Sequence, residues 1–247
     1  MKKILLLNIG NTHTQWLITP QNRFDCLSSG RVATGDWQQD LSLLPPVESD
    51  CAVWAACVVP QARKVLAESG IYADLSWVDS KSAAVCGLDF SLVDTSTLGA
   101  DRIANAATLL EYPLPAVNFD CGTAITMEIV DAEKRFAGGA IMPGRKLMRQ
   151  SLFKGTAALP EIPLSNEIPQ EPGTNTLQAM TLGIDRGAVG MVREMLAVLQ
   201  EKNMLTTVVS GGDAPFFMQG IPGLTDGGKF FTLRGIYLIA RQSAEKQ

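Results

Sequence analysis

The sequence predicts an α/β fold made of two related halves. Apolar, strand-like runs alternate with helical segments along the chain, which is the pattern of this fold class. In addition, residues 4–12 and 116–124 each contain an apolar run, then Asn or Asp, any residue, Gly and a small polar residue. An apolar run that stops at a glycine turn is typical of a buried strand followed by a loop where a ligand can approach the backbone. We therefore expect two halves whose loops face each other across a cleft.

In the first half, the clearest element is a helix near residues 99–111. Apolar residues from Ile103 to Leu110 recur at the spacing of one helical face, and Pro113 and Pro115 end the pattern. The other elements predicted for this half are strands at 3–8, 13–19 and 52–58 and a helix at 61–69.

The second half contains the longest predicted helix, residues 176–200. Three glycines within it (Gly183, Gly187 and Gly190) lower helix propensity and indicate close backbone packing against a neighbour. The remaining predictions are strands at 116–119, 126–130, 136–140 and 204–209, a turn at 138–144, a proline-rich loop at 160–172 and a helix at 233–243.

Composition excludes several classes of protein. The 247 residues are 46% hydrophobic and 19% charged, as in a globular protein, and the net charge of −4 argues against a broad nucleic-acid-binding surface. No apolar stretch approaches the roughly 20 residues needed to span a membrane. The run Ile4–Leu7 after two lysines is too short for a secretory signal, so we expect a first strand there.

The cysteine and histidine content indicates a reducing compartment. Five cysteines occur without metal-type pairing, and His13 is the single histidine, so a Cys/His zinc site is not expected. The simpler interpretation is that the cysteines are reduced, small core residues of a cytoplasmic protein.

Three strand-ending glycine turns could hold phosphate. Gly10-Asn11-Thr12 can offer backbone N–H groups and a hydroxyl to phosphate oxygens, because glycine lets the chain approach closely. Each turn alone has an ordinary structural explanation. Together with Asp120-Cys121-Gly122-Thr123 and Gly211-Gly212, however, it predicts a clamp for a nucleotide triphosphate.

The segment Gly99-Ala100-Asp101-Arg102 opens the helix of the first half. An aspartate in a first helical turn is favoured by the helix dipole, so an ordinary helix start explains it without any function. The alternative is catalytic: Asp101 accepts a hydroxyl proton while Arg102 binds a carboxylate or phosphate with its planar fork. Phosphoryl transfer to an alcohol needs a proton acceptor, an anion-binding group and a cation that offsets the developing charge.

In their order, these motifs resemble the type III pantothenate kinases of the acetate kinase/sugar kinase/Hsp70/actin superfamily. The resemblance covers nearly the whole chain. It is carried by residues 8–12, 99–102, 120–124, 138–144, 147–160, 175–176 and 210–214.

The resemblance implies two ribonuclease H-like (actin-like ATPase) domains, residues 1–112 and 113–247, each a mixed sheet flanked by helices, with the active site in the cleft between them. It also implies a homodimer that phosphorylates pantothenate with ATP, Mg²⁺ and a monovalent cation (K⁺ or NH₄⁺), without nucleic-acid or membrane partners. The implied ATP-binding residues are Asn8, Ile9, Gly10, Asn11, Thr12, His13, Thr14, Gln15 and Thr123. The implied pantothenate-binding residues are Leu92, Gly99, Ala100, Asp101, Arg102 and Thr176, with Asp101 as the proton acceptor. Asp120 is implied to bind the monovalent cation.

Two positions depart from the family pattern. Asn8 replaces an aspartate, so a neutral amide stands where a carboxylate would help to hold the magnesium–phosphate assembly. Leu92 replaces a tyrosine that commonly contacts the substrate. Three functions therefore stay open: an active pantothenate kinase, a weakened kinase-fold binding or regulatory protein, and a kinase for another small alcohol.

Overall fold

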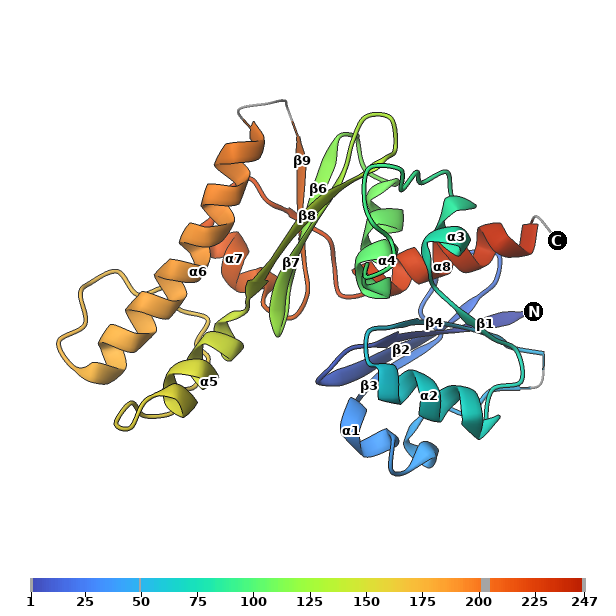
Figure 1. Cartoon of the computed structure of the whole chain (residues 1–247), viewed down its shortest axis with the longest axis horizontal. Coiled ribbons are helices and arrows are strands. Elements are labelled where there is room, and N and C mark those ends of the chain that lie inside the picture. Colours follow the sequence, from blue (N-terminus) through green and yellow to red (C-terminus); the bar gives the residue numbers. More distant parts are fainter. Residues whose placement is uncertain (1, 49, 201–204, 246–247) are drawn as a thin grey trace. The chain divides into compact units, whose positions relative to one another are not determined.

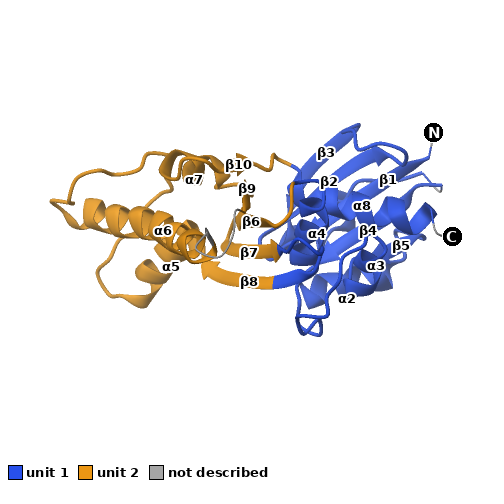
Figure 2. Cartoon of the chain, turned by 90° about the horizontal axis from the view of Figure 1, so that it is seen from above, with its two compact units in different colours: residues 1–112, 130–137, 230–247 blue, residues 113–129, 138–229 orange. Residues whose placement is uncertain are grey.

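The structure, a computed structural model, describes residues 2–48, 50–200 and 205–245 (Figure 1). The chain forms two compact units. Unit 1 comprises residues 1–112, 130–137 and 230–247, and unit 2 comprises residues 113–129 and 138–229 (Figure 2). The chain enters unit 2 after residue 112. Two later segments return to unit 1. Within the described ranges, no helix has the length and apolar character required to traverse a membrane.

Unit 1 contains a five-stranded sheet in the order β3-β2-β1-β4-β5. Its strands are β1 (Lys3–Ile9), β2 (His13–Pro20), β3 (Ser28–Ala33), β4 (Ala52–Cys57) and β5 (Leu75–Trp77). Its helices are α1 (Thr34–Trp37), the 3₁₀ helix η1 (Leu41–Leu43), α2 (Pro60–Ser69), α3 (Ser80–Ala84), α4 (Ala100–Leu109) and α8 (Phe231–Glu245). The sheet is mixed, because β1 pairs antiparallel with β2 and parallel with β4.

The apolar sequence of β1 follows from its central position. Leu5, Leu7 and Ile9 are buried in a core that also contains Trp37 and Leu66. The alternating side chains of the strand point to the opposite face, on the side where α8 contacts β1. A strand covered on both faces must be apolar throughout, which explains the uninterrupted run from residue 4 to residue 7.

Helix α8 belongs to unit 1 because it packs directly on α4. A methyl group at Gly235 would approach the carbonyl oxygen of Ala104 to under 3.0 Å, so only glycine allows this spacing. The Thr108 hydroxyl also donates to the carbonyl of Phe231 at 2.8 Å. The last segment of the chain therefore completes the first sheet's helical layer rather than the second half of the sequence.

Unit 2 contains the second five-stranded sheet, in the order β10-β9-β6-β7-β8. Its strands are β6 (Ala116–Cys121), β7 (Ala124–Val130), β8 (Phe136–Pro143), β9 (Thr206–Ser210) and β10 (Thr225–Asp226), and its helices are α5 (Arg145–Gly155), α6 (Thr176–Gln200) and α7 (Ala214–Gly220). The core packs Phe119 and Val209 of the sheet against α6 and α7, including Val192 and Phe216.

Several elements differ from the sequence predictions. The strand expected at 136–140 continues to Pro143, so residues 138–143 are strand rather than turn. The following residues form α5, which was not predicted. The described part of β9 begins at Thr206, whereas Met204, where the strand was expected to start, lies outside the described residues. The other predicted helices and strands are present with ends that shift by a few residues.

Candidate active site

The turn between β1 and β2 carries the predicted ATP-binding stretch of unit 1. The backbone N–H of Gly10 donates to the carbonyl of His13 at 3.1 Å, which closes the turn. Asn11 and Thr12 are exposed at its tip. By contrast, Ile9 and Thr14 are buried, so their side chains belong to the interior. Asn8 and Gln15 face each other across the two strands.

A buried hydrogen-bond chain supports this turn from below. The indole N–H of Trp37 donates to the Thr14 hydroxyl at 2.7 Å, and that hydroxyl lies 3.1 Å from the Thr34 hydroxyl. Thr34 Oγ1 then donates to the carbonyl of Gly10 at 2.7 Å. The backbone N–H of Thr34 donates to the carbonyl of Thr12 at 3.1 Å. One threonine therefore fixes the carbonyl orientations on both sides of the exposed tip.

We expect Thr34→Val to weaken nucleotide binding about threefold to tenfold, because one net hydrogen bond is worth about 1 kcal/mol. Valine keeps the shape of threonine but cannot donate to Gly10. Isothermal titration calorimetry with a non-hydrolysable ATP analogue measures the effect. Thr19→Val is the matched control, since Thr19 is equally buried but donates to Arg23, away from the turn. Equal binding by both variants would contradict the supporting role of Thr34.

Asp101 lies in the first turn of α4, next to the ends of β1 and β4. The N–H of Val58, just after β4, donates to the carbonyl of Ile9 at 3.1 Å. Val58 is also the side chain nearest to Gly99 after Asp101. A methyl group at Gly99 would lie 2.6 Å from Asp101 Oδ1, so glycine allows the carboxylate to lie here without being displaced. Unit 1 therefore brings the 8–12 turn and the Gly99–Arg102 segment together.

The Asp101 carboxylate is half-buried and available as a base. Its Oδ1 accepts the backbone N–H of Arg102 at 2.8 Å, and it forms no ion pair with any described residue. Burial raises the pKa of Asp101 above its ordinary value, and the hydrogen bond and positive charge of Arg102 oppose this shift. A raised pKa makes a carboxylate a stronger base, which suits proton transfer.

The other predicted substrate residues are placed as follows. Arg102 holds its guanidinium 5.7 Å from the centre of the Phe136 ring. Leu92 is 53% exposed on the loop between α3 and α4. Ala100 is buried at the start of α4, and Thr176 is exposed at the start of α6 in unit 2. Within unit 1, no hydrogen bond or ion pair joins Leu92 to the Asp101 carboxylate.

In unit 2, the turn after β6 is enclosed by two other glycine segments. The N–H of Gly144 donates to the carbonyl of Thr123 at 3.0 Å, and a methyl group at Gly144 would come within 3.0 Å of that carbonyl. Gly211 has φ of +87°, and a methyl group there would come within 3.0 Å of Asp120 Oδ1 and of the carbonyl oxygen of Cys121. The exposed Thr123 side chain and the half-buried Asp120 are therefore held in one compact group of turns.

The charge of this group favours a cation. Burial raises the pKa of the Cys121 thiol, and the negative charges of Asp120, Asp213 and Glu128 raise it further. Carboxylate and carbonyl oxygens are the donors that hard cations prefer. Within the described ranges, no three His, Cys, Asp or Glu side chains gather in a metal-binding cluster, so Asp120 would act with backbone oxygens and water.

The sequence analysis did not single out Arg145. Its buried guanidinium lies 3.0 Å from Asp213, the residue that follows the Gly211-Gly212 turn. Asp213 belongs to the motif at residues 210–214, and Arg145 directly follows the motif at residues 138–144. Their positions next to glycine turns are the signal that could have identified both.

Comparison with known proteins decides the family. A model of the type III pantothenate kinase family matches residues 4–198. The chain belongs to the type III pantothenate kinase family. The type III pantothenate kinase of Akkermansia muciniphila is 31% identical over 246 residues, which cover 96% of this chain and 97% of the relative. That of Thermosynechococcus vestitus is 42% identical over 122 residues, about half of each chain.

A solved structure confirms the fold. The activator of the 2-hydroxyisocaproyl-CoA dehydratase from Clostridium difficile, solved with bound ADPNP, superposes with a TM-score of 0.55 over 99% of this chain and 96% of its own, at 11% identity. The two mixed five-stranded sheets flanked by helices are those of the actin-like ATPases and sugar kinases, as predicted. The family prediction is likewise confirmed.

Proposed function

We propose that this protein phosphorylates pantothenate with ATP and produces 4′-phosphopantothenate, the first step of coenzyme A synthesis. Membership of the kinase family supports the reaction class. The observation that carries the assignment to these residues is the Asp101 carboxylate. It is half-buried and has no ion pair in the described chain, and it follows Gly99, which lies next to Val58 and the end of β1.

In the proposed reaction, Asp101 accepts the proton of the primary hydroxyl of pantothenate. The hydroxyl oxygen forms a bond to the γ-phosphorus of ATP while the bond from that phosphorus to the β–γ bridging oxygen breaks, and ADP leaves. Arg102 binds the carboxylate of pantothenate, since a guanidinium pairs well with a carboxylate. Gly99 leaves the space in which the Asp101 carboxylate sits.

Each unit, taken by itself, offers groups suited to the phosphates of ATP. The exposed tip at Asn11 and Thr12 offers backbone N–H groups and a hydroxyl to phosphate oxygens, and Thr123 offers a second hydroxyl from unit 2. The structural relative with bound ADPNP supports an adenine nucleotide as the ligand of this fold.

Asp120 is our candidate for the monovalent cation. The Asp120 carboxylate and the carbonyl oxygens of its turn are hard donors of the kind that such an ion prefers. Mg²⁺ would enter with ATP, as is usual where a site offers few carboxylates. Asn8, half-buried at the end of β1, can contribute an amide oxygen but no charge.

A coupled ADP-release assay tests the proposal with purified protein, ATP, Mg²⁺, K⁺ and a panel of small alcohols. Turnover that requires pantothenate and falls when K⁺ is omitted supports it. Brisk turnover on another alcohol, with none on pantothenate, would show a different kinase.

Asn8 motivates a second candidate function, that of a weakened binding or regulatory protein. Loss of the carboxylate at this position removes a negative charge that would attract Mg²⁺. ATP binding without turnover in the natural chain, with turnover restored by Asn8→Asp, would select this function.

We also propose that the protein is a homodimer that pairs through α6. Gly183, Gly187 and Gly190 lie on one exposed face of the helix. A methyl group at any of them would meet no atom within 4 Å, the backbone of α6 itself set aside. No residue of unit 2 covers these glycines, and in the proposed dimer the α6 helix of a second copy takes this place.

Light scattering after size-exclusion chromatography should give about twice the 26.5 kDa of one chain. Gly187→Leu should shift the protein to the monomer mass, because the side chain would hold the two helices apart. Gln61→Leu, on an exposed position of α2, is the control and should stay dimeric. A dimeric Gly187→Leu variant would exclude this face as the interface.

We place the protein in the cytoplasm. All five cysteines are free thiols, including the exposed Cys26, and persistent free thiols are typical of reducing compartments.

A further inference from the structure

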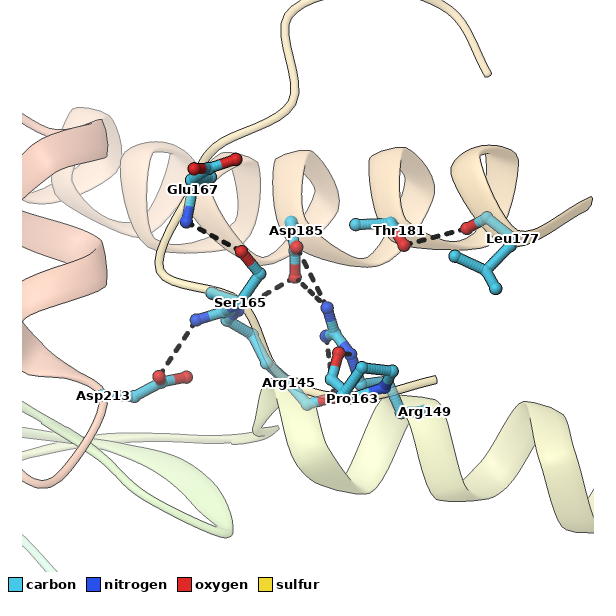
Figure 3. A network of polar contacts seen from close by, with 9 residues as sticks. All are labelled: Arg145, Arg149, Pro163, Ser165, Glu167, Leu177, Thr181, Asp185 and Asp213. Atoms are coloured by element: carbon cyan, nitrogen blue, oxygen red, sulfur yellow. Dashed lines mark hydrogen bonds and ion pairs between the residues drawn. The ribbon is translucent and has the colours of Figure 1, made fainter. Parts of the chain in front are cut away.

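Four charged side chains of unit 2 form a buried network (Figure 3). Arg145 Nε lies 2.9 Å from Asp185 Oδ1, and Arg145 Nη1 lies 3.0 Å from Asp213 Oδ1. Arg149 Nη2 lies 2.9 Å from Asp185. Arg145 and Asp185 are fully buried, whereas the Asp213 side chain keeps 18% of its surface exposed. Asp213 is therefore the member through which the network reaches the protein surface.

The three nitrogen atoms of the Arg145 guanidinium contact three different segments of the chain. Besides the two carboxylates, Arg145 donates through Nη2 to the carbonyl of Ser165 in the proline-rich loop. Its Cζ atom also lies 3.3 Å from the centre of the Phe216 ring on α7. A planar fork with this set of fixed acceptors can occupy only one orientation, so Arg145 links α6, α7 and the loop rigidly.

The charges of the network balance. Two guanidinium groups face two carboxylates, and a buried charge left without its partner is strongly unfavourable. Burial raises the pKa of Asp213, while the charge of Arg145 opposes that shift. Arg145, whose Nη1 lies 3.0 Å from the carboxylate, therefore favours the ionised form of Asp213.

The network is attached to both glycine turns of the proposed nucleotide and cation site. Arg145 directly follows Gly144, whose N–H donates to the carbonyl of Thr123. On the other side, the N–H of Asp213 donates to the carbonyl of Cys121 at 2.9 Å. The backbone of Gly144, next to Arg145, therefore holds one side of the Asp120–Thr123 turn. The Arg145 side chain holds Asp213, whose segment encloses the other side of that turn.

We propose that Arg145 is a positioning residue for nucleotide binding: it fixes Asp213, and with it the Gly211–Asp213 turn, against the Asp120 turn. This inference rests on the proposed function of these turns. It predicts that a change at Arg145 affects ATP and the cation more than pantothenate.

Arg149 provides a matched comparison. It is as buried as Arg145, binds the same Asp185 and donates to the carbonyl of Pro163 in the same loop at 3.2 Å. It makes no hydrogen bond or ion pair with Asp213. A purely structural role of the network predicts similar effects at the two arginines, whereas a positioning role predicts different ones.

The test compares Arg145→Lys with Arg149→Lys in the full chain. Each variant keeps one positive charge, but an ammonium group cannot reproduce the fork. We expect Arg145→Lys to raise KM for ATP and the K⁺ concentration for half-maximal activity about tenfold or more, since small displacements of binding groups have effects of this size. KM for pantothenate should change less than twofold. Arg149→Lys should leave all three constants within twofold of the natural protein.

Equal shifts in the two variants, or equal shifts of both KM values in Arg145→Lys, would overturn the proposal. If Arg145→Lys does not fold, Asp213→Asn replaces it: a raised KM for ATP supports the positioning role, and an unchanged one rejects it. Calorimetry with an ATP analogue, without pantothenate, distinguishes failure of the proposed function from failure of the inference about Arg145. No binding by the natural protein would refute the proposed function, whereas normal binding by both the natural protein and Arg145→Lys would refute this inference alone.

Discussion

Asp101→Asn is expected to reduce kcat for pantothenate phosphorylation by about 10²–10⁴-fold, the usual contribution of a positioned general base. Asparagine has nearly the same shape, and its side-chain oxygen can still accept the N–H of Arg102. Binding of ATP and pantothenate should therefore change little. The coupled assay gives kcat, and calorimetry gives the two binding constants. Undiminished kcat in this variant would exclude Asp101 as the base.

The same variant should be at least as stable as the natural protein near neutral pH. Because the pKa of Asp101 is raised on folding, the folded state binds this proton more tightly than the unfolded state. The contribution of this proton binding to the free energy of unfolding is fully present below the unfolded pKa. It is lost as the pH rises through the folded pKa. At neutral pH the ionised carboxylate is thus a cost that asparagine removes. A lower Tm would show that Asp101 has a structural role.

The pH profile provides an independent check. A base must be deprotonated, so activity should fall as the pH decreases through the pKa of Asp101. This loss should occur at a higher pH than an ordinary aspartate would give, since burial raises that pKa.

The second large effect is expected for Gly144→Ala, which should lower Tm by roughly 5–10 °C and abolish activity. Gly144 has φ of −74° and ψ of 162°, which alanine can adopt, so the penalty is steric. The added methyl group would come within 3.0 Å of the carbonyl oxygens of Gly122 and Thr123. Backbone cannot yield as a flexible side chain can. The turn that carries Asp120 would have to move.

Gly155→Ala is the matched control for this change. Gly155 ends the same helix, is exposed, and a methyl group there would meet no atom within 4 Å. Differential scanning fluorimetry should show a Tm within about 2 °C of the natural protein, since exposed substitutions typically change stability by less than 0.5 kcal/mol. Equal melting of the two variants would show that the Gly144 contact is not required.

The main features of the fold could be predicted because local pattern and tertiary position agree. The apolar run of β1 is buried on both faces, and the apolar spacing of residues 103–110 matches α4. The glycines of α6 also indicated close packing, yet no residue of unit 2 packs on them. The family was recognised from turn motifs, and the comparisons confirm it.

Other features depend on contacts between distant residues and left little local signal. The association of α8 with unit 1 requires Gly235 to meet Ala104, more than half the chain away. The partners of Arg145 lie on α6, on the proline-rich loop and after β9. Likewise, no spacing rule indicates that Thr34 and Trp37 support the Gly10 turn. The substrate roles of Leu92 and Thr176 stay predictions.

Analysis of the reaction product tests the central claim most directly. The natural protein, ATP, Mg²⁺, K⁺ and pantothenate are incubated, and the product is examined by mass spectrometry and ³¹P NMR. We predict that pantothenate gains one phosphate, as an ester of its primary hydroxyl, in step with ADP release. Unmodified pantothenate in the presence of bound ATP, or phosphate on its carboxylate, would contradict the account.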